Sequence, residues 1–220
     1  MTSELMERID EIIAQKSLLK HPFYEAWNRG DLPVESLKEY AFQYYHFERS
    51  YPTFISGLHH RCDDTSVRQL LLDNLWDEEH GDENHLELWL KFCDSLGLDR
   101  ADVEEGKQAE STKKLVATYK DLTSMGSVAS GAASLYAFES QIPSVASAKI
   151  EGLRDNYGID NEEAVSFFSV HKTLDEVHSE AERDMVESLV ETEEEFEEVI
   201  VAVETATDAL YSFLDGVYKS

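Results

Sequence analysis

The sequence predicts an all-α protein, a single-domain helical bundle of about seven helices formed by residues 1–220. Two observations favour this class. Long stretches carry apolar residues at helical spacing, and four prolines and ten glycines are too few for the evenly spaced turns of a β-sandwich or barrel. A chain of this length can bury one substantial core, and no linker-like stretch divides it.

The N-terminal third of the chain is predicted to form four helices, most of them rich in aromatic residues, over residues 3–15, 22–28, 33–50 and 54–62. Pro22 suits the first position of the second helix, and Gly30 suits the position just beyond its end. Proline lacks the backbone N–H that continues a helix, so Pro52 is expected to separate the third helix from the fourth.

A long helix is predicted over residues 65–96, but its middle is polar where an apolar face is expected. Glu78 and His85 lie within about 20° of one another on the helical wheel, yet about 10.5 Å apart along the axis. The pair therefore either serves two different ions or converges through a distortion of the helix. Gly81 between them permits such a distortion.

The C-terminal half is predicted to form four helices, over residues 101–122, 124–157, 160–190 and 192–220. Pro143 is expected to kink the second of these helices. Glu139 lies in an otherwise apolar part of the same helix. A carboxylate in such a setting needs a partner, because an unpaired buried charge is costly.

The strongest global signal is the charge, since 46 acidic and 19 basic residues give a formal net charge of −27. A surface this negative repels a polyanion, so we expect no nucleic-acid partner. Self-repulsion of this size becomes tolerable where salt screens it, which favours a salt-adapted, halophilic protein. An ordinary acidic cytosolic protein is the alternative.

The two cysteines, Cys62 and Cys93, show neither disulfide-framework nor zinc-knuckle spacing, which suits a reducing compartment. The N-terminal residues lack a basic and apolar leader, and no apolar run reaches the ~18 residues of a membrane span. We therefore expect a cytoplasmic protein without a membrane partner.

The residues with the clearest chemical pattern are His171, Asp175 and His178. At about 100° per residue, Asp175 lies about 40° and His178 about 20° from His171, so all three side chains can point into one bundle interior. Together with Glu78, His85 and Glu139, they offer three imidazoles and three carboxylates. This donor set suits a pair of first-row ions, iron or manganese, in a helix-bundle core.

The alternative is that the histidines are satisfied core residues and that the carboxylates lie on a solvated face. It explains Glu79, Asp82 and Glu83 well. It explains Glu139 and the His171 trio poorly, because unpaired charges buried without a cation cost several kcal/mol.

Five motifs resemble a known family over nearly the whole chain: residues 19–27, residues 43–46, Glu78-x6-His85, Phe138-Glu139-x3-Pro143 and His171-x3-Asp175-x2-His178. The family is that of the heme-oxygenase-like di-metal oxidases and oxygenases, relatives of the thiaminase-2 and pyrroloquinoline-quinone synthase folds. Within it, the likeness is greatest to self-sacrificing 4-aminobenzoate synthases, which serve folate-type cofactor biosynthesis.

The resemblance implies that a dinuclear site, Fe/Fe or Fe/Mn, activates dioxygen with electrons from an external reductant. It implies that the ligands are Glu78, His85, Glu139, His171, Asp175 and His178. It also implies that Tyr24 is excised to form the aminobenzoate ring and that Lys149 donates the amino group, so that each molecule acts once. From spacing alone, Tyr24 is a core tyrosine. A homodimer is one assembly that the resemblance leaves open.

The chain departs from the family at Phe138, where a tyrosine is expected beside the ligand glutamate. Phenylalanine carries no hydroxyl, so a relay through this position is absent or runs through Tyr40 or Tyr136.

Two other functions stay open: an oxygenase of the same kind acting on an external small molecule, and a metal-binding helical protein without turnover. A thiaminase is disfavoured, because no cysteine lies near Glu139.

Overall fold

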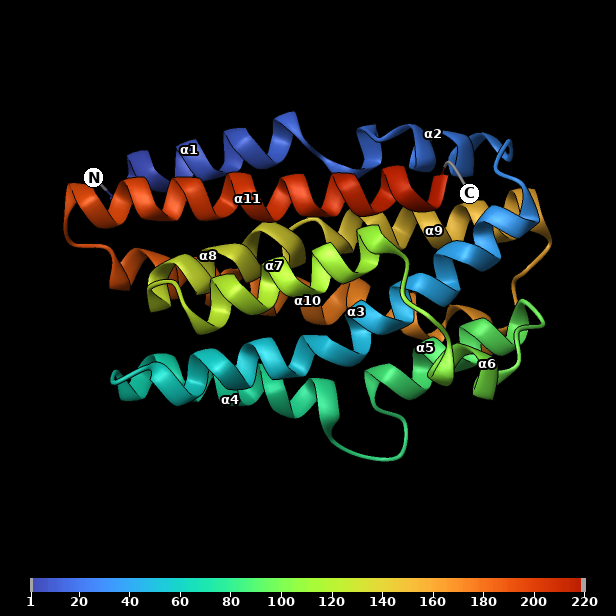
Figure 1. Cartoon of the computed structure of the whole chain (residues 1–220), viewed down its shortest axis with the longest axis horizontal. Helices are drawn as coiled ribbons and strands as arrows, with labels where there is room; N and C mark the ends of the chain where they lie inside the picture. The colour runs from blue at the N-terminus through green and yellow to red at the C-terminus, as the bar shows by residue number, and fades with distance from the viewer. Residues whose placement is uncertain (1, 219–220) are drawn as a thin grey trace.

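The computed structural model of the chain describes residues 2–218, which form an all-α bundle without β-strands (Figure 1). The fold class is as predicted, but the bundle has more than the expected seven or so helices. In chain order the elements are α1 (Thr2–Gln15), the 3-10 helix η1 (Leu18–Lys20), α2 (Pro22–Arg29), α3 (Val34–Arg61), α4 (Thr65–Glu79), α5 (His85–Ser95), α6 (Arg100–Glu105), α7 (Glu110–Ser124), α8 (Val128–Glu139), α9 (Ile142–Tyr157), α10 (Glu162–Leu189) and α11 (Glu193–Tyr218).

Pro52 does not interrupt its helix, because α3 continues unbroken from Val34 to Arg61. The proline still removes one backbone N–H from the helix. Burial of the residues around it, including Tyr51, Phe54 and Ile55, stabilises the helical path against that loss. The expectation of two helices in this region was wrong, since tertiary packing overrides the local signal.

The long helix expected over residues 65–96 is two helices, and the break falls at Gly81. Gly81 has φ of +90°, a left-handed conformation that glycine adopts without strain. Asn84 then caps α5, because its side-chain oxygen accepts a hydrogen bond from the Glu87 backbone N–H at 3.0 Å. The break places His85 at the start of α5 and turns it back toward the end of α4.

Two further predicted helices are also divided. The segment over residues 101–122 is split into α6 and α7, with Gly106 just beyond the end of α6. The helix predicted over residues 124–157 is also two helices, because α8 ends at Glu139 and α9 begins at Ile142. Pro143 lies in the first turn of α9, where its missing N–H costs no helical hydrogen bond. The last helix is described as far as Tyr218, and its predicted final two residues lie outside the described part of the chain.

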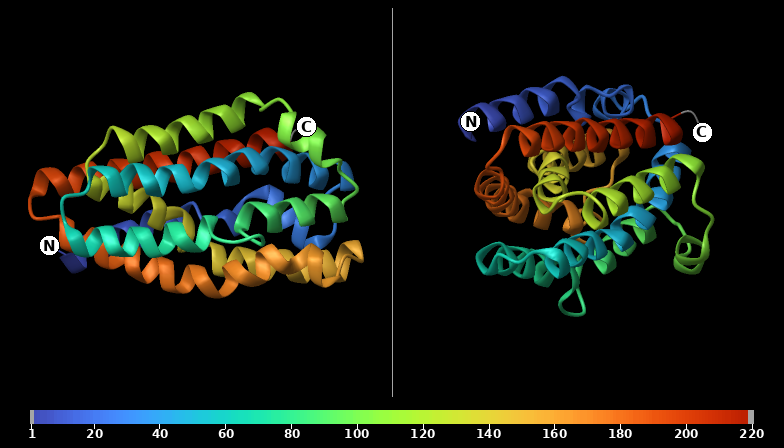
Figure 2. Two further views of the ribbon diagram at one scale, coloured as in Figure 1. Left: turned by 90° about the horizontal axis from the view of Figure 1, so that it is seen from below. Right: turned by 60° about the vertical axis from the view of Figure 1, so that its left-hand side comes forward.

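The helix at the centre of the bundle is α8, in which every residue from Ala129 to Glu139 is buried. It packs against both α10 and α11, the two C-terminal helices that run along the length of the molecule as the orange and red ribbons in the left view of Figure 2. On another side α8 approaches α3 closely, and a small residue permits this approach: a Cβ added to Gly131 would lie 2.3 Å from Leu58 Cδ2. As a result, Glu139 at the end of α8 lies deep inside the protein. Across residues 2–218, no helix combines the length and the apolar character needed to cross a membrane.

Candidate metal centre

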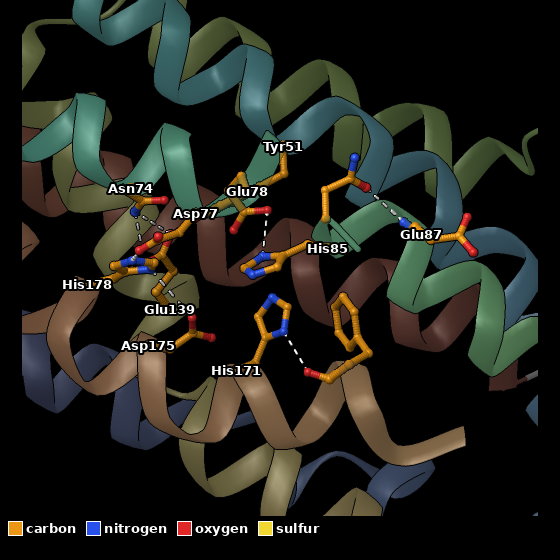
Figure 3. A network of polar contacts seen from close by, with 12 residues as sticks. Tyr51, Asn74, Asp77, Glu78, His85, Glu87, Glu139, His171, Asp175 and His178 are labelled. Atoms are coloured by element: carbon orange, nitrogen blue, oxygen red, sulfur yellow. Dashed lines mark hydrogen bonds and ion pairs between the residues drawn. The ribbon is translucent and has the colours of Figure 1, made fainter. Parts of the chain in front are cut away.

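The six predicted ligand residues all lie in one buried region between the helices (Figure 3). They come from four helices: Glu78 from α4, His85 from α5, Glu139 from α8, and His171, Asp175 and His178 from α10. The potential ligand atoms fall into two separate groups. This division corresponds to the expectation of two ions rather than one.

The first group consists of Glu48, Glu78, His85 and His171, whose potential ligand atoms lie within 4.8 Å of one another. Nδ1 of His85 is 3.0 Å from Oε2 of Glu78. The break at Gly81 thus removes the separation of about 10.5 Å that a continuous helix would impose. Nδ1 of His171 lies 2.8 Å from the Phe167 carbonyl oxygen. Since a carbonyl can only accept, His171 keeps Nε2 unprotonated and able to bind a metal.

The second group consists of Glu139, Asp175 and His178. Nδ1 of His178 is 3.6 Å from Glu139 and 3.7 Å from Asp175, while Nε2 lies 3.1 Å from Oδ2 of Asp77. A hydrogen bond from Nε2 to Asp77 orients the ring so that Nδ1 faces the two carboxylates, from where it could bind an ion held between them after losing its proton. Asp77 therefore acts through His178 and holds its position.

Two buried glutamates of this region were missed by the sequence analysis. Glu48 belongs to the first group. Glu182 is fully buried, and its carboxylate lies close enough to that of Glu139 for the two charges to interact. Glu182 follows His178 by four residues on α10, so the helical spacing that identified the trio would also have found it. Glu48 gave no such signal, because it lies in an aromatic stretch of α3 without a neighbouring pattern of ligands.

Burial changes the protonation of both groups. Loss of water raises the pKa of Asp175 to about 8 and raises those of Glu48, Glu139 and Glu182 as well. Burial and the charge of His85 lower the pKa of His171 well below its usual range, which keeps this imidazole neutral. Carboxylates that hold protons in the absence of a cation release them when a metal binds.

Several polar atoms in the two groups, and in Glu182 beside them, are buried without a hydrogen-bonding partner of good geometry among residues 2–218. They are Nδ1 of His85, Oδ2 of Asp175, Nδ1 of His178 and both carboxylate oxygens of Glu182. Buried polar atoms are normally satisfied, and orphans that converge on one region point to a missing ion or water. Imidazole nitrogens and carboxylate oxygens are the donor set that iron and manganese bind. The residues present therefore fit a pair of first-row ions.

The two residues assigned to the reaction by resemblance, Tyr24 and Lys149, line a common cavity of about 20 Å³. Nζ of Lys149 donates a hydrogen bond to the Tyr40 hydroxyl at 2.6 Å, and the hydroxyls of Tyr40 and Tyr24 are 3.4 Å apart. Nζ lies 5.8 Å from the centre of the Tyr24 ring. Tyr40 thus links the amine to the tyrosine.

Burial lowers the pKa of Lys149 to about 7 and raises that of Tyr24. Close to neutral pH, a large fraction of Lys149 is therefore a neutral amine with a free electron pair. No carboxylate forms an ion pair with Lys149 among the described residues, and aromatic rings surround its amine. This environment suits a reactive amine better than a structural ion pair.

The cavity and the metal-binding groups are adjacent but separate. Phe138 lines the cavity, and its neighbour Glu139 belongs to the second group. Tyr44 also lines the cavity. Burial raises the pKa of the Tyr44 hydroxyl, and the nearby charge of Glu48 in the first group raises it further. Phe138 and Tyr44 therefore connect the wall of the cavity with the two ligand groups.

Comparison with known proteins identifies relatives over the full length of the chain. It is 41% identical to a 4-aminobenzoate synthase of Nitrosomonas europaea, with 100% of this chain and 93% of that protein aligned. It is 39% identical to a 4-aminobenzoate synthase of Chlamydia muridarum, with 98% of this chain and 91% of the relative aligned.

The fold has a solved counterpart in a domain from Shewanella denitrificans described as having a heme oxygenase-like fold. The two superpose with a TM-score of 0.83 at 18% sequence identity, covering 100% of this chain and 92% of that one. The fold is therefore heme-oxygenase-like, as the resemblance implied. The sequence model of the TENA/THI-4/PQQC family matches residues 7–220, and the chain belongs to this family.

Proposed function

We propose that this protein makes 4-aminobenzoate from the side chain of its own Tyr24, with Lys149 as the amino donor. Two first-row ions, iron with iron or iron with manganese, dioxygen and an external reductant complete the system. Full-length relatives named 4-aminobenzoate synthase, at 36–41% identity, make the chain an oxidative enzyme. They also support the identity of the product.

The observation that carries the proposal is the small cavity shared by Tyr24 and Lys149. Its volume of about 20 Å³ has room for about one water molecule. A separate aromatic substrate is several times larger than that. The aromatic ring already next to the neutral amine is that of a tyrosine in the chain, which supports self-sacrifice over the use of an external ring.

The composition of the product agrees with this source. 4-Aminobenzoate is a benzene ring with one carboxyl carbon and a nitrogen opposite to it. The ring and Cβ of a tyrosine supply all seven carbons, provided that the bond between Cα and Cβ breaks and Cβ is oxidised to the carboxylate. The phenol oxygen leaves as water, and the nitrogen of Lys149 takes its place on the ring. The bond between Nζ and Cε of Lys149 then breaks as Cε is oxidised to an aldehyde. Dioxygen, with electrons from the external reductant, is the oxidant for both Cβ of Tyr24 and Cε of Lys149.

The residues around the cavity have distinct tasks in this scheme. Tyr40 holds the Lys149 amine by the hydrogen bond of 2.6 Å and directs it toward the hydroxyl end of Tyr24. The aromatic and aliphatic lining shields the amine from bulk water, which favours its neutral form. Glu78, His85, Glu139, His171, Asp175 and His178 would hold the ions, which when bound supply the activation of dioxygen.

The proposal is tested with protein grown on tyrosine labelled with ¹³C in the ring. The purified protein receives Fe²⁺, Mn²⁺, reductant and dioxygen, but no organic substrate. We expect labelled 4-aminobenzoate at no more than one molecule per chain, and a matching loss of mass in the peptide that contains Tyr24. Tyr24→Phe should give no product. Tyr157→Phe, which changes a tyrosine bonded to the Leu32 carbonyl outside the cavity, should react normally.

The second candidate function is an oxygenase that acts on an external small molecule. A surface pocket of about 230 Å³ favours it, because the pocket is lined by Glu48 and Glu78 of the first group together with Arg49 and Pro52. Sustained turnover that begins only after an organic substrate is added, with Tyr24 intact, would establish this function instead. Protein that takes up no metal would exclude both.

A further inference from the structure

We propose that Glu48 is a direct ligand of the ion bound by the first group, in addition to the six ligand residues discussed above. This inference rests on the proposed two-metal function, since it concerns the composition of one of its sites. It assigns the first ion four protein ligands, namely Glu48, Glu78, His85 and His171.

The position of Glu48 is the first observation. Its carboxylate comes from α3, yet it lies with the ligand atoms of α4, α5 and α10, all within 4.8 Å of one another. The side chain is only 4% exposed. Within residues 2–218, Glu48 takes part in no hydrogen bond or ion pair that would explain a buried carboxylate. A cation shared with its neighbours would supply that partner.

The balance of charge is the second observation. The second group offers two carboxylates, Glu139 and Asp175, which neutralise one divalent ion. Without Glu48, the first group offers a single carboxylate to its ion. With Glu48 it offers two, so that each divalent ion meets two negative charges in a region where unbalanced charge is costly. Both sites would then offer the same negative charge, and they would differ only in that the first has two histidine ligands and the second has one.

The third observation is the surface pocket of about 230 Å³, which has Glu48 and Glu78 on its wall. An ion that binds in a buried group needs a path from solvent. This pocket joins the surface to two carboxylates of the first group. Glu79 also lines it, but Glu79 is exposed and lies outside the group, which makes it a natural control.

The experiment compares the wild-type protein, E48Q and E79Q, each stripped of metal and then titrated with Mn²⁺. Both substitutions remove one negative charge from the same pocket. Bound Mn²⁺ is counted by equilibrium dialysis with elemental analysis. We expect about two ions per chain in the wild-type protein and E79Q. We expect at least about 10-fold weaker binding of one ion in E48Q, because even residues that only orient ligands contribute 10–100-fold to metal affinity.

Two further measurements separate a ligand from a structural residue. Metal-free E48Q should melt no lower than metal-free wild type, since the change removes a buried carboxylate beside Glu78, but it should gain less thermal stability from Mn²⁺. Anomalous scattering from wild-type crystals soaked in Mn²⁺ should place an ion about 2.2 Å from a Glu48 oxygen.

Two ions per chain in E48Q with unchanged affinity, or an ion in the first group that leaves Glu48 uncoordinated, would overturn this inference alone. Absence of Mn²⁺ and Fe²⁺ binding in the wild-type protein would instead overturn the proposed function.

Discussion

The hydroxyl of Tyr51 on α3 donates a hydrogen bond to Oε1 of Glu139 on α8. Its ring packs beside Phe138, with the ring centres 5.2 Å apart. The phenol that the family resemblance led us to expect at position 138 is thus supplied from a different helix. Of the two tyrosines considered for that role, Tyr136 bonds instead to Asp10 near the surface, and Tyr40 bonds to Lys149.

Tyr51→Phe should lower the free energy of unfolding of the metal-free protein by about 1–3 kcal/mol. The reason is that the buried carboxylate of Glu139 loses one of its two side-chain hydrogen-bond donors within residues 2–218 and keeps the other, the Asn74 amide at 3.1 Å and 3.3 Å. Urea denaturation measures the change.

If a phenol beside Glu139 is also needed for the reaction, the double variant Tyr51→Phe with Phe138→Tyr should recover part of the product that the single variant loses.

Tyr119→Phe is the matched control for this change. Tyr119 is fully buried in the same aromatic cluster, but its hydroxyl has no hydrogen-bonding partner within the described residues. Its removal should therefore leave stability unchanged or raise it. Equal losses in the two variants would show that the phenol ring environment, and not the bond to Glu139, accounts for the effect.

The helices were predictable from the sequence because apolar spacing depends on neighbours along the chain. Their interruptions were predictable only in part, because Gly81 and Pro143 marked places where a helix could distort or kink, but not which helices would end. Pro52 continues a helix because burial of its surroundings outweighs a missing N–H. Gly81 ends one because the positive φ and the Asn84 cap turn the chain back. Both outcomes depend on contacts between helices, which local patterns do not contain.

The candidate site was predictable to the extent that one helix carries it. His171, Asp175 and His178 share a face of α10, so their convergence follows from periodicity alone. Glu48 joins the site only through the packing of α3 against α4 and α5. No spacing within α3 marks that residue as different from any other glutamate.

Product formation should depend on pH through Lys149, whose pKa burial lowers to about 7. Only the neutral amine can attack carbon, and its fraction rises with pH. The amount formed in a fixed short time should therefore increase about tenfold between pH 6 and pH 8. Lys149→Met should form no product while binding metal normally, and Lys114→Met, at an exposed lysine, should behave as wild type. A flat profile would contradict the role of the amine.

Lys149 should also make the free energy of unfolding rise with pH, whereas a lysine in a surface ion pair makes it fall. Its pKa is lower in the folded protein than in the unfolded chain, so the unfolded chain binds more protons between about pH 7 and the ordinary lysine range. The wild-type protein should therefore gain stability as pH rises through this window. Lys149→Met should be the more stable protein at pH 7, and its advantage should shrink toward pH 10. Urea denaturation at several pH values checks the trend.

Metal removal should destabilise the folded protein, because the ions bind groups that exist only when α4, α5, α8 and α10 are packed together. An ion present at about 100 times its dissociation constant adds about 2.7 kcal/mol to the free energy of unfolding. A chelator should remove that increment, as measured by thermal melts. His171→Ala should lower both metal content and the gain in stability. His80→Ala is the control, because His80 is exposed and stacks on Trp76 outside both groups.

Salt should stabilise this protein more than an ordinary acidic one, because its net charge of −27 is spread along the whole chain. At 1 M salt the Debye length falls to about 3 Å, so repulsion between exposed carboxylates is largely screened. A gain of about 2 kcal/mol in the free energy of unfolding would raise Tm by about 4–8 °C. Thermal melts in sodium chloride from low to molar concentration measure the rise, with sucrose as a control for excluded-solute effects. Equal Tm values in low and molar salt would rule out salt adaptation.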